Sequence, residues 1–233
     1  MKSRAAAFEA LAEEVHGCFK CPRLVAWREE VGKDPPRRYQ GQKYWSRPLS
    51  GFGDPAARII VVGLAPAAHG GNRTGRMFTG DRSADWLFAA MHRAGLANQP
   101  TSEHRGDGLR LRDAYVTAVV KCAPPANRPT TEERDNCLPY LERELELLDR
   151  ARIVVALGKF GWDGFLAAAR AIGVATPRPK PQFAHGAEAV LDERLTLLGC
   201  FHPSQQNTFT GKLTVPMIDA VFGRAVELAS APK

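Results

Sequence analysis

Residues 58–66 read RIIVVGLAP, and this short stretch decides the fold. Four β-branched residues, Ile59 to Val62, follow one another with no polar position between them. A strand that exposes one face to water alternates apolar and polar residues, whereas a strand covered on both faces does not. The stretch therefore predicts a buried strand of the parallel-sheet type.

Apolar runs of the same kind recur at 113–122, 152–158 and 194–201. Helical patterns lie before, between and after these runs, at 3–16, 83–96, from 131 onward, 159–172 and 215–229. Strands that alternate with helices predict an α/β sandwich with a mainly parallel sheet. Residues 28–57 are rich in proline, glycine and aromatic residues, and we expect them to form a long surface segment.

The composition is that of a folded, basic protein. Of the 233 residues, 44% are hydrophobic and 24% are charged, and the formal net charge is +7. The excess charge suits a polyanion such as nucleic acid, although an ordinary basic protein has the same balance. No apolar run approaches the roughly 20 residues of a membrane span. Glutamates interrupt the N-terminal segment where an export signal is apolar, so we expect a cytoplasmic protein.

Five cysteines need an explanation in such a protein, because disulfides are uncommon in the cytosol. Cys18 and Cys21 form a C-x-x-C pair, and Cys122 ends a predicted strand 15 positions before Cys137. Four thiolates hold either a tetrahedral zinc ion or an iron–sulfur cluster, and the wide spacing of the second pair slightly favours the cluster. The alternative for Cys122 and Cys137 is a pair of buried free thiols, and Cys200 is expected in the core.

Polar or glycine-rich loops follow three of the predicted strands. They begin at Gly63 (GLAPAAHGGNRTG), Lys121 (KCAPPANRPTT) and His202 (HPSQQNTFTG). Because ligands bind beyond the carboxyl ends of parallel strands, these loops predict one shared site. After the first loop, Phe78 either stacks on a planar ring or plugs the loop against the core. Asp81 either starts a helix or orients a water molecule.

Three segments, GLAPAAHGGNRTGRMFTGDRSADWL, VVKCAPPANRPTTEE and HPSQQNTFTGKLT, together with the first four cysteines, resemble the family 5 (type B) uracil-DNA glycosylases. The resemblance implies one domain over 1–233, folded as a three-layer α/β/α sandwich around a four-stranded parallel sheet. It implies a structural [4Fe–4S] cluster held by Cys18, Cys21, Cys122 and Cys137. The implied reaction hydrolyses the N-glycosidic bond of uracil, or of another deaminated base such as hypoxanthine, in DNA. The abasic site that remains would initiate base excision repair.

The same resemblance gives roles to individual residues. His202 matches the histidine that faces the extruded base, where a hydrogen-bond donor would stabilise the charge of the departing base; otherwise it only caps a strand. Where the sister family 4 has a glutamate and an asparagine, this chain has Leu64 and Ala118. Asp81 and Asn127 are expected to supply the polar groups that are missing at those two positions. The residues expected at the base are Phe78, Ala67, Ala68 and Gly63. Those expected to contact DNA are Ser204, Gln205, Gln206, Asn207, Arg73, Arg76, Arg128 and Lys212, with the loop 203–208 entering the duplex.

Two other classes of protein stay open. A non-catalytic iron–sulfur protein that binds damaged DNA would keep the charge and the cysteines but would not need His202. An iron–sulfur redox protein would expose its cluster, whereas the long helices expected around Cys137 indicate a shielded one. Whether the protein is a glycosylase or a non-catalytic DNA-binding protein, we expect it to be a monomer that associates with the nucleoid by binding DNA.

Overall fold

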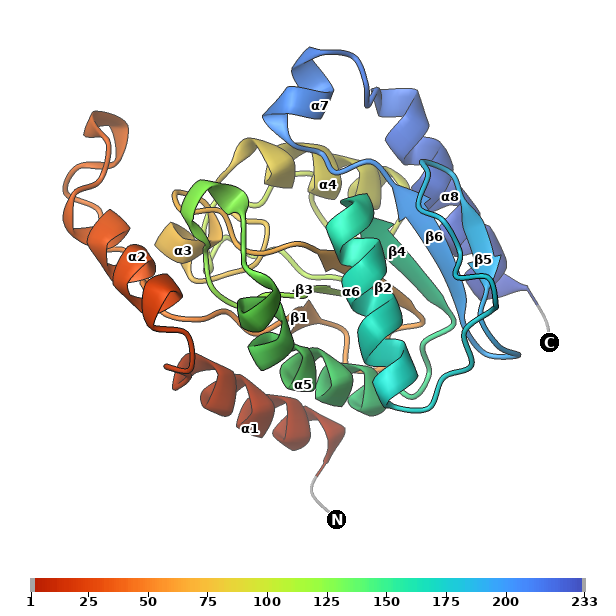
Figure 1. Cartoon of the computed structure of the whole chain (residues 1–233). Coiled ribbons are helices and arrows are strands. Elements are labelled where there is room, and N and C mark those ends of the chain that lie inside the picture. Colours follow the sequence, from red (N-terminus) through yellow and green to blue (C-terminus); the bar gives the residue numbers. More distant parts are fainter. Residues whose placement is uncertain (1–2, 232–233) are drawn as a thin grey trace.

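The computed structural model of the chain describes residues 3–231, and its centre is a six-stranded sheet (Figure 1). The strands are β1 (Phe52–Gly53), β2 (Ile59–Gly63), β3 (Ala114–Ala118), β4 (Ile153–Leu157), β5 (Glu188–Val190) and β6 (Thr196–Cys200). Their order across the sheet is β1-β3-β2-β4-β6-β5, so the stretch that decides the fold lies near the middle. Strands β3, β2, β4 and β6 run parallel and correspond to the four predicted strands.

The four expected parallel strands are present, and two antiparallel edge strands that were not predicted extend the sheet to six. Strands β1 and β5 pair antiparallel to β3 and β6. The first has two residues, and the second has exposed residues at both of its ends. Short edge strands pack little surface and therefore leave no apolar run in the sequence. The mainly parallel α/β architecture is confirmed.

Helices cover both faces of the sheet and complete three layers (Figure 1). The long ones are α1 (Arg4–His16), α2 (Pro22–Lys33), α4 (Arg82–Arg93), α5 (Thr131–Leu147), α6 (Gly158–Ala171) and α8 (Val215–Ser230). Along β2, Ile59 and Val61 share a core with α4 and α8, whereas Ile60 and Val62 share a core with α5 and α6. Alternate side chains of a strand point to opposite faces, which explains why this run has no polar position.

Helix α2 corrects the expectation of a continuous surface segment over 28–57. Cys21 is its N-cap and Pro22 occupies its first turn, where the missing N–H of proline costs nothing. Leu24 is fully buried in the core shared with α5 and α6, and Arg28 and Val31 are also buried. The surface segment therefore begins only after Lys33, at the end of this helix.

Short elements follow the carboxyl ends of three parallel strands, and one of them, α7, lies at the top of Figure 1. They are α3 (Gly71–Thr74) after β2, the 3-10 turn η2 (Pro125–Asn127) after β3, and α7 (Gln205–Phe209) after β6. A further 3-10 turn, η1 (Arg37–Tyr39), lies in the segment that follows α2. Within residues 3–231, the helices all lack the length and apolarity needed to cross a bilayer.

Candidate functional site

The three loops predicted to meet do enclose one cleft at the carboxyl edge of the sheet. Its cavity measures about 600 Å³. It is lined after β2 by Leu64, Ala65, Ala67, Phe78, Asp81, Arg82 and Ser83, after β3 by Ala126, Asn127 and Arg128, and after β6 by His202, Ser204, Gln205 and Gln206. All three catalytic candidates and Phe78 therefore lie in the same cleft, as parallel strands require of loops at one edge.

Phe78 forms an apolar wall of the cleft beside the histidine. Its backbone adopts φ +47°, a left-handed conformation that is strained for a phenylalanine. The ring lies directly on Gly63, where an added Cβ would meet Phe78 Cε2 at 2.8 Å. The ring centroids of Phe78 and His202 are 6.1 Å apart, with 33° between the planes. Gly63 therefore acts through Phe78 rather than lining the cavity, and the ring both packs on the core and faces the cleft.

His202 sits at the tip of β6 as a neutral side chain. Burial lowers the pKa of its imidazole to about 4, so at neutral pH the ring carries a single N–H. The Nδ2 of Asn207 donates to the carbonyl of His202 at 2.8 Å and holds the loop that follows. A Cβ at Gly158, whose φ is +82°, would lie 3.3 Å from His202 Cβ. The neutral ring is suited to donate one hydrogen bond to a group that becomes negative.

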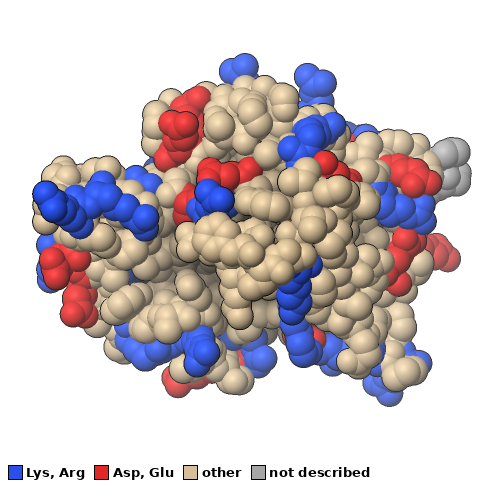
Figure 2. Space-filling model, turned by 90° about the horizontal axis from the view of Figure 1, so that it is seen from above, with Lys and Arg blue, Asp and Glu red and all other residues tan. Residues whose placement is uncertain are grey.

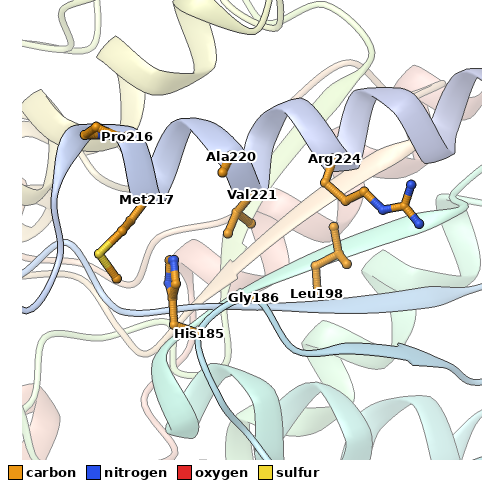
Figure 3. Close-up of a pocket in the computed structure, with 8 residues that line it drawn as sticks. All are labelled: His185, Gly186, Leu198, Pro216, Met217, Ala220, Val221 and Arg224. Carbon is orange, nitrogen blue, oxygen red and sulfur yellow. The ribbon is translucent and has the colours of Figure 1, made fainter.

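A second histidine, which was not predicted, supports the catalytic candidate from behind. The N–H of Phe201 donates to His185 Nδ1 at 3.1 Å, and the two ring centroids lie 5.0 Å apart. His185 belongs to an apolar groove between α8 and the β5–β6 edge (Figure 3). In that view His185 stands beside Met217, while Arg224 lies at the far end of the groove. The histidine thereby fixes the backbone that immediately precedes His202.

Asp81 is the N-cap of α4, which confirms its predicted place at a helix start. Its Oδ1 accepts from the backbone N–H of Ala84 at 3.0 Å. The carboxylate packs closely on Gly70, where an added Cβ would lie 2.8 Å from Asp81 Cγ. Burial raises the pKa of this carboxyl, although the hydrogen bonds of the helix N-terminus oppose the shift. The carboxyl borders the cleft, where a water molecule could reach it.

Asn127 reaches the cleft from the loop after β3. It follows Ala126 in a pair of left-handed residues, with φ of 51° for the alanine and 55° for the asparagine. Asparagine tolerates this conformation better than most residues, because its short amide can bond locally. Leu64, the expected replacement of the family 4 glutamate, lines the cleft and makes that wall apolar. Ala118 is buried at the end of β3.

The segment after His202 combines capping residues with exposed amides. Ser204 Oγ accepts from the Asn207 backbone and caps α7, while Gln205 and Gln206 are exposed at the mouth of the cleft. Phe209, at the end of α7, was not predicted as a site residue. Its side chain is 67% exposed, and the Arg82 guanidinium lies 5.1 Å from its ring centroid. An apolar residue in a polar loop was the signal that could have identified it.

The predicted phosphate contacts divide into exposed and internal side chains. Lys212 and Arg128 are exposed. Arg73 is half-buried, and its guanidinium donates to the carbonyls of His69 and Gly80. Arg76 corrects the prediction, because it is only 8% exposed and its Nη2 lies 2.7 Å from the Asp107 carboxylate. This guanidinium holds two loops together and is not at the surface.

Ala67 and Ala68 line a second cavity of about 530 Å³ that adjoins the cleft and shares Asp81 and Asn127 with it. Their small side chains leave the backbone of the loop after β2 open to a ligand. The predicted contact of these two alanines with a base stays a prediction.

Four of the five cysteines surround one small cavity near the start of α2. Cys18, Cys21, Cys122 and Cys137 line it, whereas Cys200 is buried in the core on the other face of the sheet, as predicted. Burial raises the pKa of the Cys122 thiol to about 12 and that of Cys137 to about 11. Over residues 3–231, no group of three or more His, Cys, Asp or Glu side chains is placed to hold a single metal ion.

Comparison with known proteins identifies the family of the chain. A family model described as the uracil DNA glycosylase superfamily matches residues 50–224. The chain is 53% identical over 213 residues to the type-5 uracil-DNA glycosylase of Mycobacterium tuberculosis, a match that covers 91% of this chain and 78% of the relative. It is 52% identical over 220 residues to the Mycobacterium leprae protein of that name (94% of both chains). It is 48% identical over 222 residues to that of Thermus thermophilus (95% of this chain, 98% of the relative).

Proposed function

Because the chain belongs to the uracil DNA glycosylase superfamily, we propose that it hydrolyses the N-glycosidic bond of uracil in DNA and so initiates base excision repair. The observation that carries this proposal is the cleft itself, in which a neutral histidine and an aromatic ring lie at a centroid distance of 6.1 Å. A flat base fits between an aromatic platform and a hydrogen-bond donor.

The target nucleotide must leave the base stack before its bond can be reached. Phe78 then stacks on the extruded base, and the N–H of His202 donates to a base carbonyl. When the glycosidic bond breaks, its electron pair stays with the base, and the sugar becomes positive. A donor preorganised at the growing negative charge is worth about 100- to 1000-fold in rate. A neutral donor serves here without placing a full positive charge beside the developing sugar cation.

Water completes the reaction by bonding its oxygen to C1′ of the sugar, and the proton it releases neutralises the departed base anion. Asp81 is the proposed orienting group, since its carboxyl borders the cleft and is held at the start of α4. Asn127 is the proposed partner for the base edge or the water. A dissociative bond cleavage needs little help from a strong base, so positioning is the main demand on both residues.

Segment α7 is proposed to hold the duplex open. Gln205 and Gln206 are exposed at the cleft mouth, where their amides can pair with the base left without a partner. Phe209 has the most exposed large apolar side chain within residues 3–231, at 67%. Its ring can stack on the bases that lose a neighbour when the target nucleotide leaves the duplex. Asn207 supports this segment internally through its bond to the His202 carbonyl.

Activity on further deaminated bases, hypoxanthine among them, is part of the proposal. The apolar wall at Leu64, Ala65 and Ala67 offers few hydrogen-bonding side chains that would reject a base other than uracil. Specificity that rests on stacking and on one histidine donor is expected to be broad, because most deaminated bases offer a flat face and a carbonyl.

We also propose that the four cysteines hold an iron–sulfur cluster, and their surroundings fit an anionic group. Arg28 is 1% exposed, and within the described residues no carboxylate pairs with it. Its Nη1 donates to Cys122 Sγ and to the Cys18 carbonyl, each at 3.2 Å, and over 3–231 its Nε has no partner. A buried cation needs a nearby anion, and metal-bound thiolates supply one. A cluster in this place would join α2 to α5 and the end of β3 without entering the reaction.

The experiment that tests the function uses end-labelled duplexes with one uracil or one hypoxanthine, treated with alkali after incubation to break abasic sites. We expect cleavage at both bases, and loss of cleavage in His202→Ala. Folded protein that binds the duplex without cleaving either base would instead support the non-catalytic alternative. Cleavage at uracil alone would refute the broad specificity and leave the glycosylase function standing.

A further inference from the structure

The segment after α2 forms a basic arm, defined here as residues 34–47. It lies at the left end of the molecule in Figure 1, beside α2 and level with the carboxyl ends of the strands. Seen from above, that end carries a band of Lys and Arg side chains (Figure 2). The match to the superfamily begins only at residue 50, so the arm lies outside it.

The arm carries charge that the rest of the described chain does not neutralise. Arg37, Arg38, Lys43 and Arg47 are all exposed, and none of them forms an ion pair within residues 3–231. Asp34 is the only acidic residue of the arm. Cations on one strip repel one another, and a polyanion relieves that repulsion.

A histidine beside the arm responds to the same field. Burial is the main cause of the lowered pKa of His69, and Arg38 and Arg73 lower it further. The positive potential of the arm therefore reaches the loop after β2, to which His69 belongs.

The arm is nonetheless fixed to the loop that builds the cleft. The backbone N–H groups of Trp45 and Ser46 donate to the carbonyls of Arg73 and Asn72, each at 3.1 Å. Tyr44 Oη lies 3.0 Å from Nδ1 of His69. Backbone and side-chain bonds of this kind hold the basic side chains at a defined distance from the cleft.

Aromatic rings anchor the arm to the same loop. The Arg73 guanidinium stacks over Tyr39 with 4.3 Å to the ring centroid, and the Tyr39 ring stacks on His69 at 5.9 Å. Trp45 packs on Gly75, where an added Cβ would approach the indole to 3.2 Å. The arm is thus an ordered surface whose cations have defined positions, as a phosphate-binding strip requires.

One cavity connects the arm with the candidate site, and a second cavity lies farther along the arm. Arg38 and Tyr39 line the cavity of about 530 Å³ that also contains Asp81, Asn127 and Gln205. Elsewhere on the arm, Lys43 and Arg47 line a cavity of about 340 Å³ together with Trp45 and Arg73. A chain of phosphates that leaves the cleft past Arg38 would next meet Lys43 and Arg47.

We propose that the arm binds the DNA backbone on one side of the extruded nucleotide, as a contact surface additional to the loops of the superfamily. This inference rests on the proposed function for its partner, since it places the same DNA. Arginine and lysine bind successive phosphates, and each contact releases counterions from the DNA. Because the arm lies on one side of the cleft only, the footprint on the DNA is asymmetric.

The test compares binding by wild type, R37Q/K43Q/R47Q and the matched control R110Q/R112Q/R150Q. The control removes three exposed cations near the amino ends of β3 and β4, at the opposite edge of the sheet. Fluorescence anisotropy is measured on duplexes with a tetrahydrofuran abasic analogue, over a range of salt, with the flank lengthened on either side. Thermal unfolding checks that each variant is folded.

For each phosphate that the arm variant no longer binds, we expect the salt slope to fall by about 0.9 and affinity at about 0.1 M salt to fall about tenfold. Wild type and the control variant should bind more tightly when the duplex is lengthened on one particular side. The arm variant should not gain affinity from that lengthening. A folded arm variant with the affinity and slope of the control would overturn the proposal. Excision from a short single-stranded oligonucleotide, measured in parallel, reports the proposed function separately, since the arm is not needed there.

Discussion

Replacing His202 with alanine tests its proposed role as a neutral hydrogen-bond donor. Burial lowers the pKa of its imidazole to about 4 from an ordinary 6.5. If the neutral ring donates to the leaving base, single-turnover excision should fall about 100- to 1000-fold, which corresponds to about 3 to 4 kcal/mol of transition-state stabilisation. His202→Gln keeps an N–H donor, so it should recover part of that activity.

The lowered pKa also makes a prediction about stability. The unfolded chain binds a proton near pH 6.5, whereas the folded ring resists protonation until about pH 4. The contribution of His202 to stability is therefore complete above the unfolded pKa and decreases as the pH falls from that value toward the folded one. Between pH 7 and pH 5 the decrease amounts to about 2 kcal/mol. The alanine variant has no such group, so its free energy of unfolding should fall by about 2 kcal/mol less than that of wild type.

Two measurements check this reasoning. Urea unfolding of wild type and His202→Ala at both pH values gives the double difference, in which other titrating groups cancel. Nuclear magnetic resonance of the imidazole Cε1–Hε1 groups gives the pKa directly, with the signal of His202 identified by its absence from the variant. A midpoint near pH 6.5 would refute the neutral-donor argument, even if the variant were inactive.

Single contacts elsewhere in the fold make three further predictions. Gly63→Ala should displace the Phe78 ring, because the added Cβ would lie 2.8 Å from Cε2, and excision should slow by about tenfold or more in a protein whose circular dichroism is unchanged. Lys121→Met should lower the free energy of unfolding in urea by about 3 to 5 kcal/mol, since the Glu144 carboxylate, 1% exposed, loses the cation that lies 2.8 Å from it; a decrease under about 1 kcal/mol would contradict this. Cys122→Ser should lower the iron content and the visible absorbance of purified protein, whereas Cys200→Ser, in the core, should keep both.

The inner sheet could be predicted because burial on both faces leaves a continuous apolar run. Once Ile59–Val62 and its three counterparts were identified as parallel strands, the loops after them had to meet at one edge. His202, Phe78, Asp81 and Asn127 do line one cleft for that reason. Their distances, and the neutrality of His202, could not be predicted, because both depend on packing between segments far apart in the chain.

The errors share a physical cause. Arg76 has the sequence surroundings of a surface cation, because its partner Asp107 lies 31 positions away in the chain. Helix α2 has no clear apolar periodicity, because only Leu24, Arg28 and Val31 are buried along it and one of these three is charged. The sequence therefore does not predict it. Composition predicts burial for apolar side chains, but it does not predict which charged side chain finds a buried partner.

Helix α2 connects the two features that the reaction itself does not use. Cys21 caps its N-terminus at the cysteine cavity, and the basic arm begins directly after its C-terminal residue, Lys33. Between these ends, Leu24 packs in the core and the Arg28 carbonyl accepts from Asn72, in the loop that also holds the arm. A rigid helix transmits a displacement at one end to the other. If the proposed cluster fixes Cys21, it would therefore also help to fix the position of the arm relative to the cleft.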